Sequence, residues 1–237
     1  MKVLGIISGM GTRAGLLFAN KMVDYLDVTS DQDFPEFLLH NNSKVPDRTK
    51  AIFEVGESPI EELRRSIRIL NEGNADVIVA TCITAYHFIA DLEGESKAKI
   101  LNPITLVRDH ILQYYRDTIR VGLLCTSGTL RSELFQRSFD NTGVELITLG
   151  KGDQPNLFMR SVYMENGFKS SRVSKEAGEL MNAAVDSLLR EGVELIIGGC
   201  SEVQLCLSRE TMAIPYIDTM DVLAKAALSE ICDQSFS

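Results

Sequence analysis

The chain of 237 residues is poor in basic charge: 24 Lys and Arg side chains stand against 33 Asp and Glu, and the formal net charge is −9. Nucleic acids and anionic membranes bind surfaces with an excess of Lys and Arg, so this balance argues against both as partners. The sequence also lacks any uninterrupted apolar run near the ~18 residues of a membrane-spanning helix. Its 45% of hydrophobic residues can still bury a full core, as one large domain or two smaller lobes.

A disulfide framework and an export signal are not indicated either. The five cysteines (82, 125, 200, 206, 232) are odd in number and lie mostly in apolar or helical stretches. The start, MKVLGIISGMG, superficially resembles a signal peptide, but its apolar run ends at Ile7, glycines follow and Arg13 comes early. A buried first strand is the better interpretation. We therefore expect reduced thiols and a cytoplasmic protein.

Short β-branched runs alternate with longer stretches of helical periodicity. The predicted strands cover 2–8, 37–41, 76–81, 100–104, 119–125, 144–149, 193–198 and 214–217. Helices are predicted between them, for example over 60–72 and 174–191, where apolar residues recur at helical spacing. The stretch GKGDQP (150–155) is predicted as a loop. Apolar strands alternating with helices predict an α/β fold with mostly parallel sheets covered on both faces.

The two halves of the chain repeat one another. VLGIISGMGTRAGLLF (3–18) aligns with RVGLLCTSGTLRSELF (120–135), and several identities share an offset of 117 residues. Among the identical pairs are Gly5/Gly122, Gly11/Gly128, Thr12/Thr129 and Phe18/Phe135. Each half also has a helix ending in Glu-Gly and a later cysteine at the end of an apolar run; Pro103 and Pro215 are predicted to open the last strand of each half. This pattern indicates two pseudo-symmetric α/β lobes related by an approximate twofold axis.

Cys82 and Cys200 are the cysteines at the equivalent strand ends, 118 residues apart. Ligands of open α/β sheets bind at the carboxyl ends of the strands, so two facing lobes would bring both thiols to one cleft. Each cysteine opens a loop toward a helix N-terminus, which favours the reactive thiolate. One thiol can remove an α-proton and the other can return a proton to the opposite face, which is what stereoinversion requires.

Several segments together resemble the cofactor-independent aspartate/glutamate racemases of the Asp/Glu/hydantoin racemase superfamily. These segments are SGMG (8–11), QDFPEFLLHN (32–41), VPDRT (45–49), ADVIVATCITA (75–85), GLLCTSGT (122–129), GGCSEVQL (198–205) and IPYIDT (214–219). The resemblance implies two similar three-layer α/β lobes with the active site between them, and racemisation of an amino acid without pyridoxal phosphate or any other cofactor. Its paired cysteines fall on Cys82 and Cys200. Its substrate-contacting groups fall on Met10, Gly11, Arg48, Thr84, Thr126, Ser127, Lys169 and Ser201, and it implies no metal ligand.

Each implied contact has a plainer alternative. Arg48 can grip a carboxylate with two N–H groups, or it can pair with its neighbour Asp47. Lys169 is a second cation for a side-chain carboxylate, or a solvated surface lysine. Hydroxyls and backbone amides of the loops can hold an α-carboxylate. Glu202 can orient the substrate ammonium or its own loop, or cap a helix.

The sequence departs from the family pattern in the first cysteine loop. Ile83 stands where these racemases usually have Asn, and Tyr86 stands where they have His, with His87 one place later. Because His87 is close to Cys82 in sequence, it can lower the pKa of that thiol, or it can pack under the loop. Ser201 replaces Thr after the second cysteine, and Cys125 adds a third thiol near the predicted cleft. These departures bear on the choice of substrate more than on the type of reaction.

Other functions account for only some of these sequence features. GMGTRA (9–14) fits a dinucleotide-binding fingerprint, but the acidic residue expected after the next strand is missing, since the chain reads HNNS (40–43) there. A cysteine–histidine hydrolase would leave the second cysteine unexplained. A related isomerase or decarboxylase and a noncatalytic amino-acid sensor remain alternatives.

We expect aspartate or glutamate as the substrate, a homodimer as the assembly, and no nucleic-acid or membrane partner. The expected lobes are 1–106 and 107–211, with the C-terminal segment, about 212–237, packing back on the first lobe.

Overall fold

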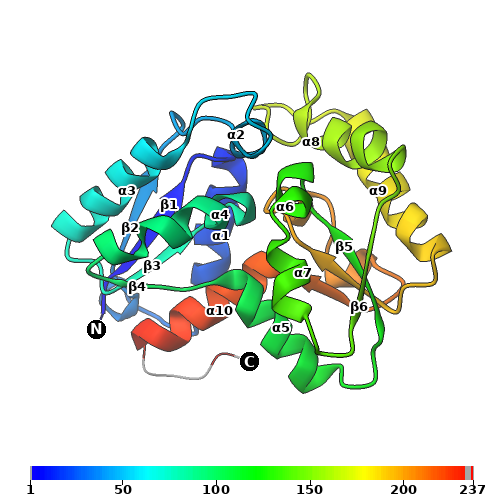
Figure 1. The fold of residues 1–237 in the computed structure, drawn as a ribbon. Helices are drawn as coiled ribbons and strands as arrows, with labels where there is room; N and C mark the ends of the chain where they lie inside the picture. Colours follow the sequence, from blue (N-terminus) through cyan, green and yellow to red (C-terminus); the bar gives the residue numbers. More distant parts are fainter. Residues whose placement is uncertain (1, 233–235, 237) are drawn as a thin grey trace.

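The computed structural model describes residues 2–232 and 236. Two four-stranded sheets form the centres of two lobes that lie side by side (Figure 1). The first sheet has the strand order β2-β1-β3-β4 and the second has the order β6-β5-β7-β8, and every neighbouring pair of strands is parallel. The same order in both sheets agrees with the duplication predicted from the sequence, and the predicted α/β fold class is confirmed.

The strands are β1 Leu4–Ser8, β2 Phe37–Asn41, β3 Val77–Ala80, β4 Lys99–Ile100, β5 Arg120–Leu124, β6 Glu145–Thr148, β7 Leu195–Gly198 and β8 Tyr216–Asp218. The α-helices are α1 Thr12–Asp24, α2 Arg48–Ile52, α3 Ile60–Glu72, α4 Tyr86–Ile89, α5 Pro103–Tyr114, α6 Ser127–Arg131, α7 Leu134–Phe139, α8 Arg160–Tyr163, α9 Lys175–Arg190 and α10 Thr219–Cys232. Shorter helical turns are η1 Asp31–Asp33, η2 Ile83–Ala85, η3 Ala90–Glu95, η5 Val203–Leu205 and η6 Arg209–Thr211, together with a π-helix, η4 Gln154–Met159.

Two local predictions are wrong. The strand predicted over 100–104 ends at Ile100, and Pro103 begins helix α5 instead of a strand. Asn102 caps this helix through a hydrogen bond from the Ile104 amide to its Oδ1 at 2.9 Å, and proline suits the first helical position because it has no N–H to leave unpaired. The loop predicted over 150–155 is too long, since η4 begins at Gln154. Pro215, in contrast, directly precedes strand β8 as predicted.

Gly5 and Gly122 occupy equivalent positions in β1 and β5, where a side chain would meet the helix that covers the sheet. A Cβ on Gly5 would lie 2.9 Å from Leu70 of α3, and a Cβ on Gly122 would lie 3.2 Å from Leu188 of α9. Leu70 and Leu188 occupy equivalent helices in the two lobes. Glycine therefore lets the covering helix approach its sheet closely in each half.

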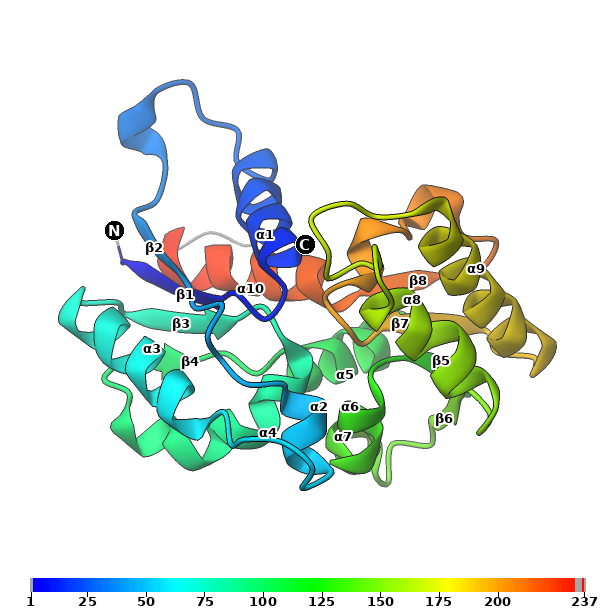
Figure 2. The same cartoon turned by 90° about the horizontal axis from the view of Figure 1, so that it is seen from above.

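The two lobes share a hydrophobic core. One buried cluster contains Ile6 and Val79 of the first sheet together with Leu123 and Ile197 of the second, joined by apolar residues of α5 and α10. A second cluster lies between the second sheet and α8–α9. Helix α10 leaves β8 and runs back along the first lobe, where it contacts α1 and β3, and it also packs on α5 (Figure 2).

The C-terminal segment thus serves both lobes. Its first part, β8, is an edge strand of the second sheet, while α10 packs on the first lobe. Residues 233–235 and 237 of the segment predicted to pack on the first lobe lie outside the described residues. Within 2–232 and 236, none of the helices is long and apolar enough to cross a membrane.

Candidate active site

Cys82 and Cys200 occupy equivalent positions beyond the carboxyl ends of two central strands. Ala80, the last residue of β3, pairs with Ile7, and Gly198, the last residue of β7, pairs with Leu124. Each cysteine lies two residues further on, and each is 6% exposed. Parallel strands direct the loops that follow them to the same edge of a sheet, so each thiol lies at the ligand-binding edge of its lobe.

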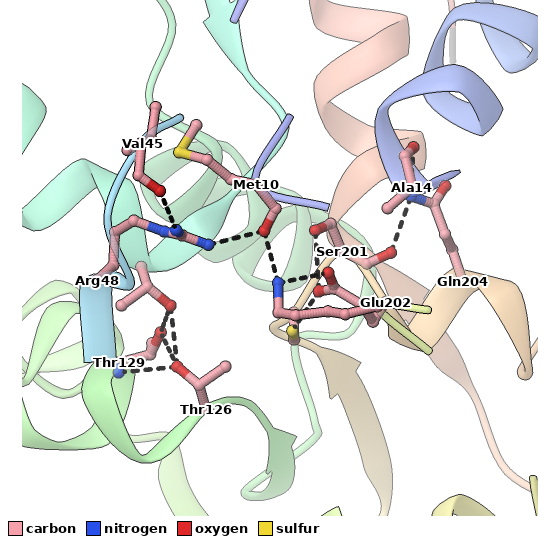
Figure 3. A network of polar contacts seen from close by, with 12 residues as sticks. Met10, Ala14, Val45, Arg48, Thr126, Thr129, Ser201, Glu202 and Gln204 are labelled. Carbon is pink, nitrogen blue, oxygen red and sulfur yellow. Dashed lines mark hydrogen bonds and ion pairs between the residues drawn. The ribbon is translucent and has the colours of Figure 1, made fainter. Parts of the chain in front are cut away.

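Arg48 is a buried cation at the start of α2, and its guanidinium contacts three backbone carbonyls. Its Nη1 donates to Val45 O at 3.2 Å and its Nη2 donates to Met10 O at 2.8 Å (Figure 3). Nη1 also donates to Pro46 O at 2.9 Å. The Nε–H group has no hydrogen-bond partner among the described residues. Asp47 does not form an ion pair with Arg48; it caps α2 by accepting a hydrogen bond from the Lys50 amide.

Arg48 interacts electrostatically with Cys82. Burial lowers the pKa of the guanidinium, but the attraction and hydrogen bonding of Cys82 and the attraction of Tyr163 outweigh it, so the pKa is raised above its ordinary value. Arg48 therefore remains a cation, with its Nε–H left for a further acceptor and the first thiol close by.

Lys169 forms the second cationic group, and it already has an anionic partner. Its Nζ donates to Met10 O at 2.5 Å and to Glu202 Oε1 at 2.8 Å. The other carboxylate oxygen of Glu202 accepts from Cys200 Sγ at 3.0 Å and from Ser201 Oγ at 3.2 Å. The Met10 carbonyl thus links Arg48 to Lys169, and Glu202 links Lys169 to Cys200, so one polar chain runs from the surroundings of Cys82 to Cys200.

Burial and mutual attraction act in opposite directions on this ion pair. Burial raises the pKa of Glu202, but Lys169 and the hydrogen bond from Cys200 lower it below its ordinary value. Burial lowers the pKa of Lys169, whereas Glu202 and Tyr163 raise it above its ordinary value. Both side chains therefore stay ionised near neutral pH.

Gly11 leaves space for the Glu202 carboxylate, because it has no side chain. A Cβ at Gly11 would lie 2.5 Å from Glu202 Oε1, so a larger residue would displace the carboxylate. The Met10–Gly11 loop, predicted as a substrate contact, therefore touches the groups that surround both cysteines.

Thr84, Thr126 and Thr129 form a buried hydroxyl cluster between the lobes. Thr84 Oγ1 lies 2.9 Å from the Oγ1 atoms of both Thr126 and Thr129, and those two atoms are 3.2 Å apart. Helix α2 packs close by, because a Cβ on Gly128 would lie 2.9 Å from Thr49 Cα. Thr84 and Thr126, two of the predicted substrate-binding residues, thus form hydrogen bonds between the lobes. Thr129 completes the cluster, and its hydroxyl was not among the predicted contacts.

Ser127 and Gln204 lie around the edges of this region. Ser127 Oγ accepts a hydrogen bond from Gln154 Nε2 at 3.3 Å, which anchors the start of α6 to η4. Gln204 Nε2 donates to Ser201 O at 2.9 Å and to Ala14 O at 3.2 Å, tying the Cys200 loop to α1 (Figure 3). Gln204 was not singled out from the sequence, and only its position in the GGCSEVQL segment could have drawn attention to it.

The other residues of the first cysteine loop contact neighbouring rings, backbone and apolar side chains. The His87 side chain is exposed and packs edge-on against Phe88, with ring centroids 4.8 Å apart. Tyr86 is buried, and its hydroxyl accepts a hydrogen bond from the Ala80 amide at 2.9 Å, bracing the end of β3. Ile83 belongs to the hydrophobic core. Burial raises the pKa of Cys125 far above its ordinary value, so this third thiol is inert.

Among residues 2–232 and 236, no group of three or more His, Cys, Asp and Glu side chains is arranged to hold a metal ion. A cavity of about 650 Å³ lies on the outer side of Lys169, where Leu16, Leu17 and Leu205 contribute apolar walls and Arg13 a charge.

Comparison with known proteins agrees with this architecture. Residues 7–227 match the family described as Asp/Glu/Hydantoin racemase. Aspartate racemase of Picrophilus torridus superposes with a TM-score of 0.86 at 28% identity, covering 98% of this chain and 95% of that one. Glutamate racemase of Francisella tularensis subsp. tularensis, solved with D-glutamate, has a TM-score of 0.70 at 12% identity over 98% of this chain and 81% of its own. The broad specificity amino-acid racemase RacX of Bacillus subtilis is 20% identical over 96% of this chain and 97% of its own.

The family match spans most of the chain and both cysteine loops, and a solved racemase shares the whole fold. The protein belongs to the Asp/Glu/Hydantoin racemase family.

Proposed function

We propose that the protein racemises an amino acid without pyridoxal phosphate, with Cys82 and Cys200 acting as acid and base on opposite faces of the α-carbon. The observation that carries this proposal is the pair of buried cysteines at equivalent strand ends, with a series of polar contacts that runs from Arg48, the neighbour of Cys82, to Cys200. A thiolate on one face can accept the α-proton while a thiol on the other face donates one.

The proposed substrate is aspartate or glutamate. A second carboxylate would be very unfavourable in so buried a region without a cation, and Arg48 offers its charge and its Nε–H, which has no partner among the described residues. The similarity to the aspartate racemase of Picrophilus torridus supports the same choice. Lys169 is a weaker candidate for this contact than Arg48, because Glu202 already neutralises its charge.

A second candidate is a racemase of larger, partly apolar amino acids. The cavity bordered by Lys169 has three leucines in its wall, and the similarity to the broad specificity racemase of Bacillus subtilis agrees with such a range. In this case Glu202 neutralises the charge of Lys169, and the side chain of the substrate extends past this ion pair toward α1.

The test is exchange of the α-proton in D₂O, followed by NMR and chiral chromatography, with both enantiomers of aspartate, glutamate, alanine, leucine and methionine. We expect deuterium incorporation and inversion with the acidic pair. Activity on leucine and methionine alone would favour the second candidate, and absence of exchange with every amino acid would favour a sensor.

The role of the thiols is tested by Cys82→Ser and Cys200→Ser, each of which should abolish inversion because each face needs its own acid or base. Cys206→Ser is the matched control, since Cys206 lies outside the polar chain. Wild-type inversion by either of the first two variants would refute the two-thiol mechanism.

Independence from cofactors is tested by dialysis against a chelator, which should leave activity unchanged. Thiol alkylation should remove the activity, and substrate should protect against it. Recovery of lost activity by added pyridoxal phosphate would contradict the proposal.

A further inference from the structure

The two cysteines lie in opposite charge environments. Cys200 Sγ donates a hydrogen bond to the Glu202 carboxylate at 3.0 Å, and Glu202 is only 2% exposed. Cys82 instead lies beside cations, since it attracts the charges of both Arg48 and Lys169. The pseudo-symmetry of the fold therefore does not extend to the electrostatics of its two thiols.

The hydrogen bond to Glu202 requires that Cys200 carry a proton. A thiolate cannot donate a hydrogen bond. A deprotonated Cys200 would lie 3.0 Å from the buried Glu202 carboxylate, and little water would be present to screen the repulsion between the two negative charges. Burial and the carboxylate together raise the pKa of Cys200 well above its ordinary value. Lys169 opposes this rise, but Glu202 Oε1 already binds its ammonium group.

Among the residues that the structure describes, Tyr163 and Tyr216 also face Cys200. Burial raises the pKa of Tyr163 and that of Tyr216 above their ordinary values, so both phenols are neutral at neutral pH. Glu202 and Lys169 are therefore the charges that decide the state of Cys200.

We propose that Glu202 is a positioning residue that keeps a proton on Cys200 in the free protein, so that Cys82 is the sulfur prepared to accept a proton from the substrate. The second half of this inference rests on the proposed racemase function. The first half concerns the protein alone and can be tested without any substrate.

The inferred turnover is balanced in protons and charge. Cys82 thiolate takes the α-proton as the C–H bond breaks, and its electron pair remains on the α-carbon. The S–H bond of Cys200 then breaks as the proton goes to the opposite face, leaving a thiol at Cys82 and a thiolate at Cys200. That thiolate lies against Glu202, so loss of the proton from Cys82 to solvent and uptake of a proton by Cys200 together reset the protein.

This asymmetry has a kinetic signature. The equilibrium constant of racemisation is one, so kcat/KM must be equal for the two enantiomers whatever the charges on the protein. Only kcat and KM separately can differ. The enantiomer whose α-hydrogen faces Cys82 binds to the protonation state that the free protein already has. This enantiomer should therefore show the lower KM and, because kcat/KM is equal for both, the lower kcat.

The first experiment is alkylation by iodoacetamide between pH 6 and 10, with each thiol followed by peptide mass spectrometry. Because Cys82 and Cys200 are each 6% exposed, steric access does not favour either. At pH 7 we expect Cys82 to react about tenfold faster than Cys200 or more. Equal rates of the two cysteines in the wild-type protein would overturn the proposal.

Variants of Glu202 separate charge from packing. Glu202→Gln should speed the alkylation of Cys200 at pH 7 by about tenfold or more, since it removes the carboxylate and frees Lys169. Glu202→Asp keeps the charge and should leave Cys200 slow, and the exposed Glu176→Gln is the matched control. The half-exposed Cys206 should react alike in all four proteins.

An unchanged Cys200 rate in a folded Glu202→Gln protein would refute the role of Glu202. The ratio of the two KM values should also move toward one in this variant, which a purely structural residue would not cause. If alkylation behaves as expected while no amino acid exchanges its α-proton, the proton assignment stands and the racemase function fails.

Discussion

Replacing Arg48 tests the basis of substrate choice most directly. The side chain is 6% exposed, and its Nη groups hold the carbonyls of Val45, Pro46 and Met10, while Nε–H is left unpaired. Arg48→Ala would remove both the anchor of these carbonyls and the proposed partner of a side-chain carboxylate. Arg48→Lys would keep the charge but lose the two-pronged geometry.

The expected magnitudes follow from these contacts. Unpairing three carbonyls from a charged donor should lower the free energy of unfolding of Arg48→Ala by about 2–4 kcal/mol, because the individual losses are not additive. A buried carboxylate without its cation costs about 2–5 kcal/mol, so kcat/KM for aspartate or glutamate should fall about 10²-fold or more. Arg48→Lys should stay nearly as stable as the wild type and still lose more than about tenfold in kcat/KM.

The assay compares kcat/KM for aspartate, glutamate and alanine in each variant, beside urea unfolding. Damage to the fold lowers activity on every substrate alike, whereas loss of a side-chain contact lowers it only for the acidic ones. Arg64→Ala is the control, because Arg64 pairs with Glu61 and Glu95 away from the cysteines. Equal losses on all three substrates would show that Arg48 serves the loop or the α-carboxylate and would refute the reasoning.

Three further predictions concern the lobes and the core. Gly128→Ala would put a Cβ 2.9 Å from the backbone of α2, so we expect reduced activity and a free energy of unfolding lower by about 1–3 kcal/mol; Gly178→Ala, with nothing within 4 Å, should stabilise slightly, and equal urea midpoints would contradict this. Burial raises the pKa of Asp218 to about 6, so the folded protein binds more protons than the unfolded chain between about pH 4 and 6, and stability should fall as pH rises through that window. Asp218→Asn should flatten this fall, measured by urea unfolding at pH 4 and 6.5; an unchanged slope would contradict the assignment. Ile83→Asn places an amide in the hydrophobic core and should lower the melting temperature, and the accompanying test is whether kcat/KM shifts toward acidic substrates, the shift expected from the family's usual Asn.

Local sequence patterns determined the architecture and the location of the two thiols. Strands such as Phe37–Asn41 and the helix Ile60–Glu72 follow from hydrophobic periodicity over neighbouring residues, and the structure has them at the predicted positions. The repeated glycines and cysteines predicted two equivalent lobes because duplication leaves its trace at fixed offsets. The strand predicted around Pro103 is a helix, because a capping asparagine followed by proline starts a helix and this local signal outweighs the apolar run.

Only the tertiary structure decided how the charges are distributed. Lys169 and Met10 are 159 residues apart, and no sequence pattern indicates that a lysine ammonium meets that carbonyl and the Glu202 carboxylate. Thr84 likewise meets Thr126 across the lobes, which turns a predicted substrate contact into a hydrogen bond between them. Such contacts depend on how two finished lobes pack, since a side chain gains its partner only when distant segments bury it together. The sequence could therefore pair the two cysteines by symmetry, but only packing gave one of them a carboxylate and the other a pair of cations.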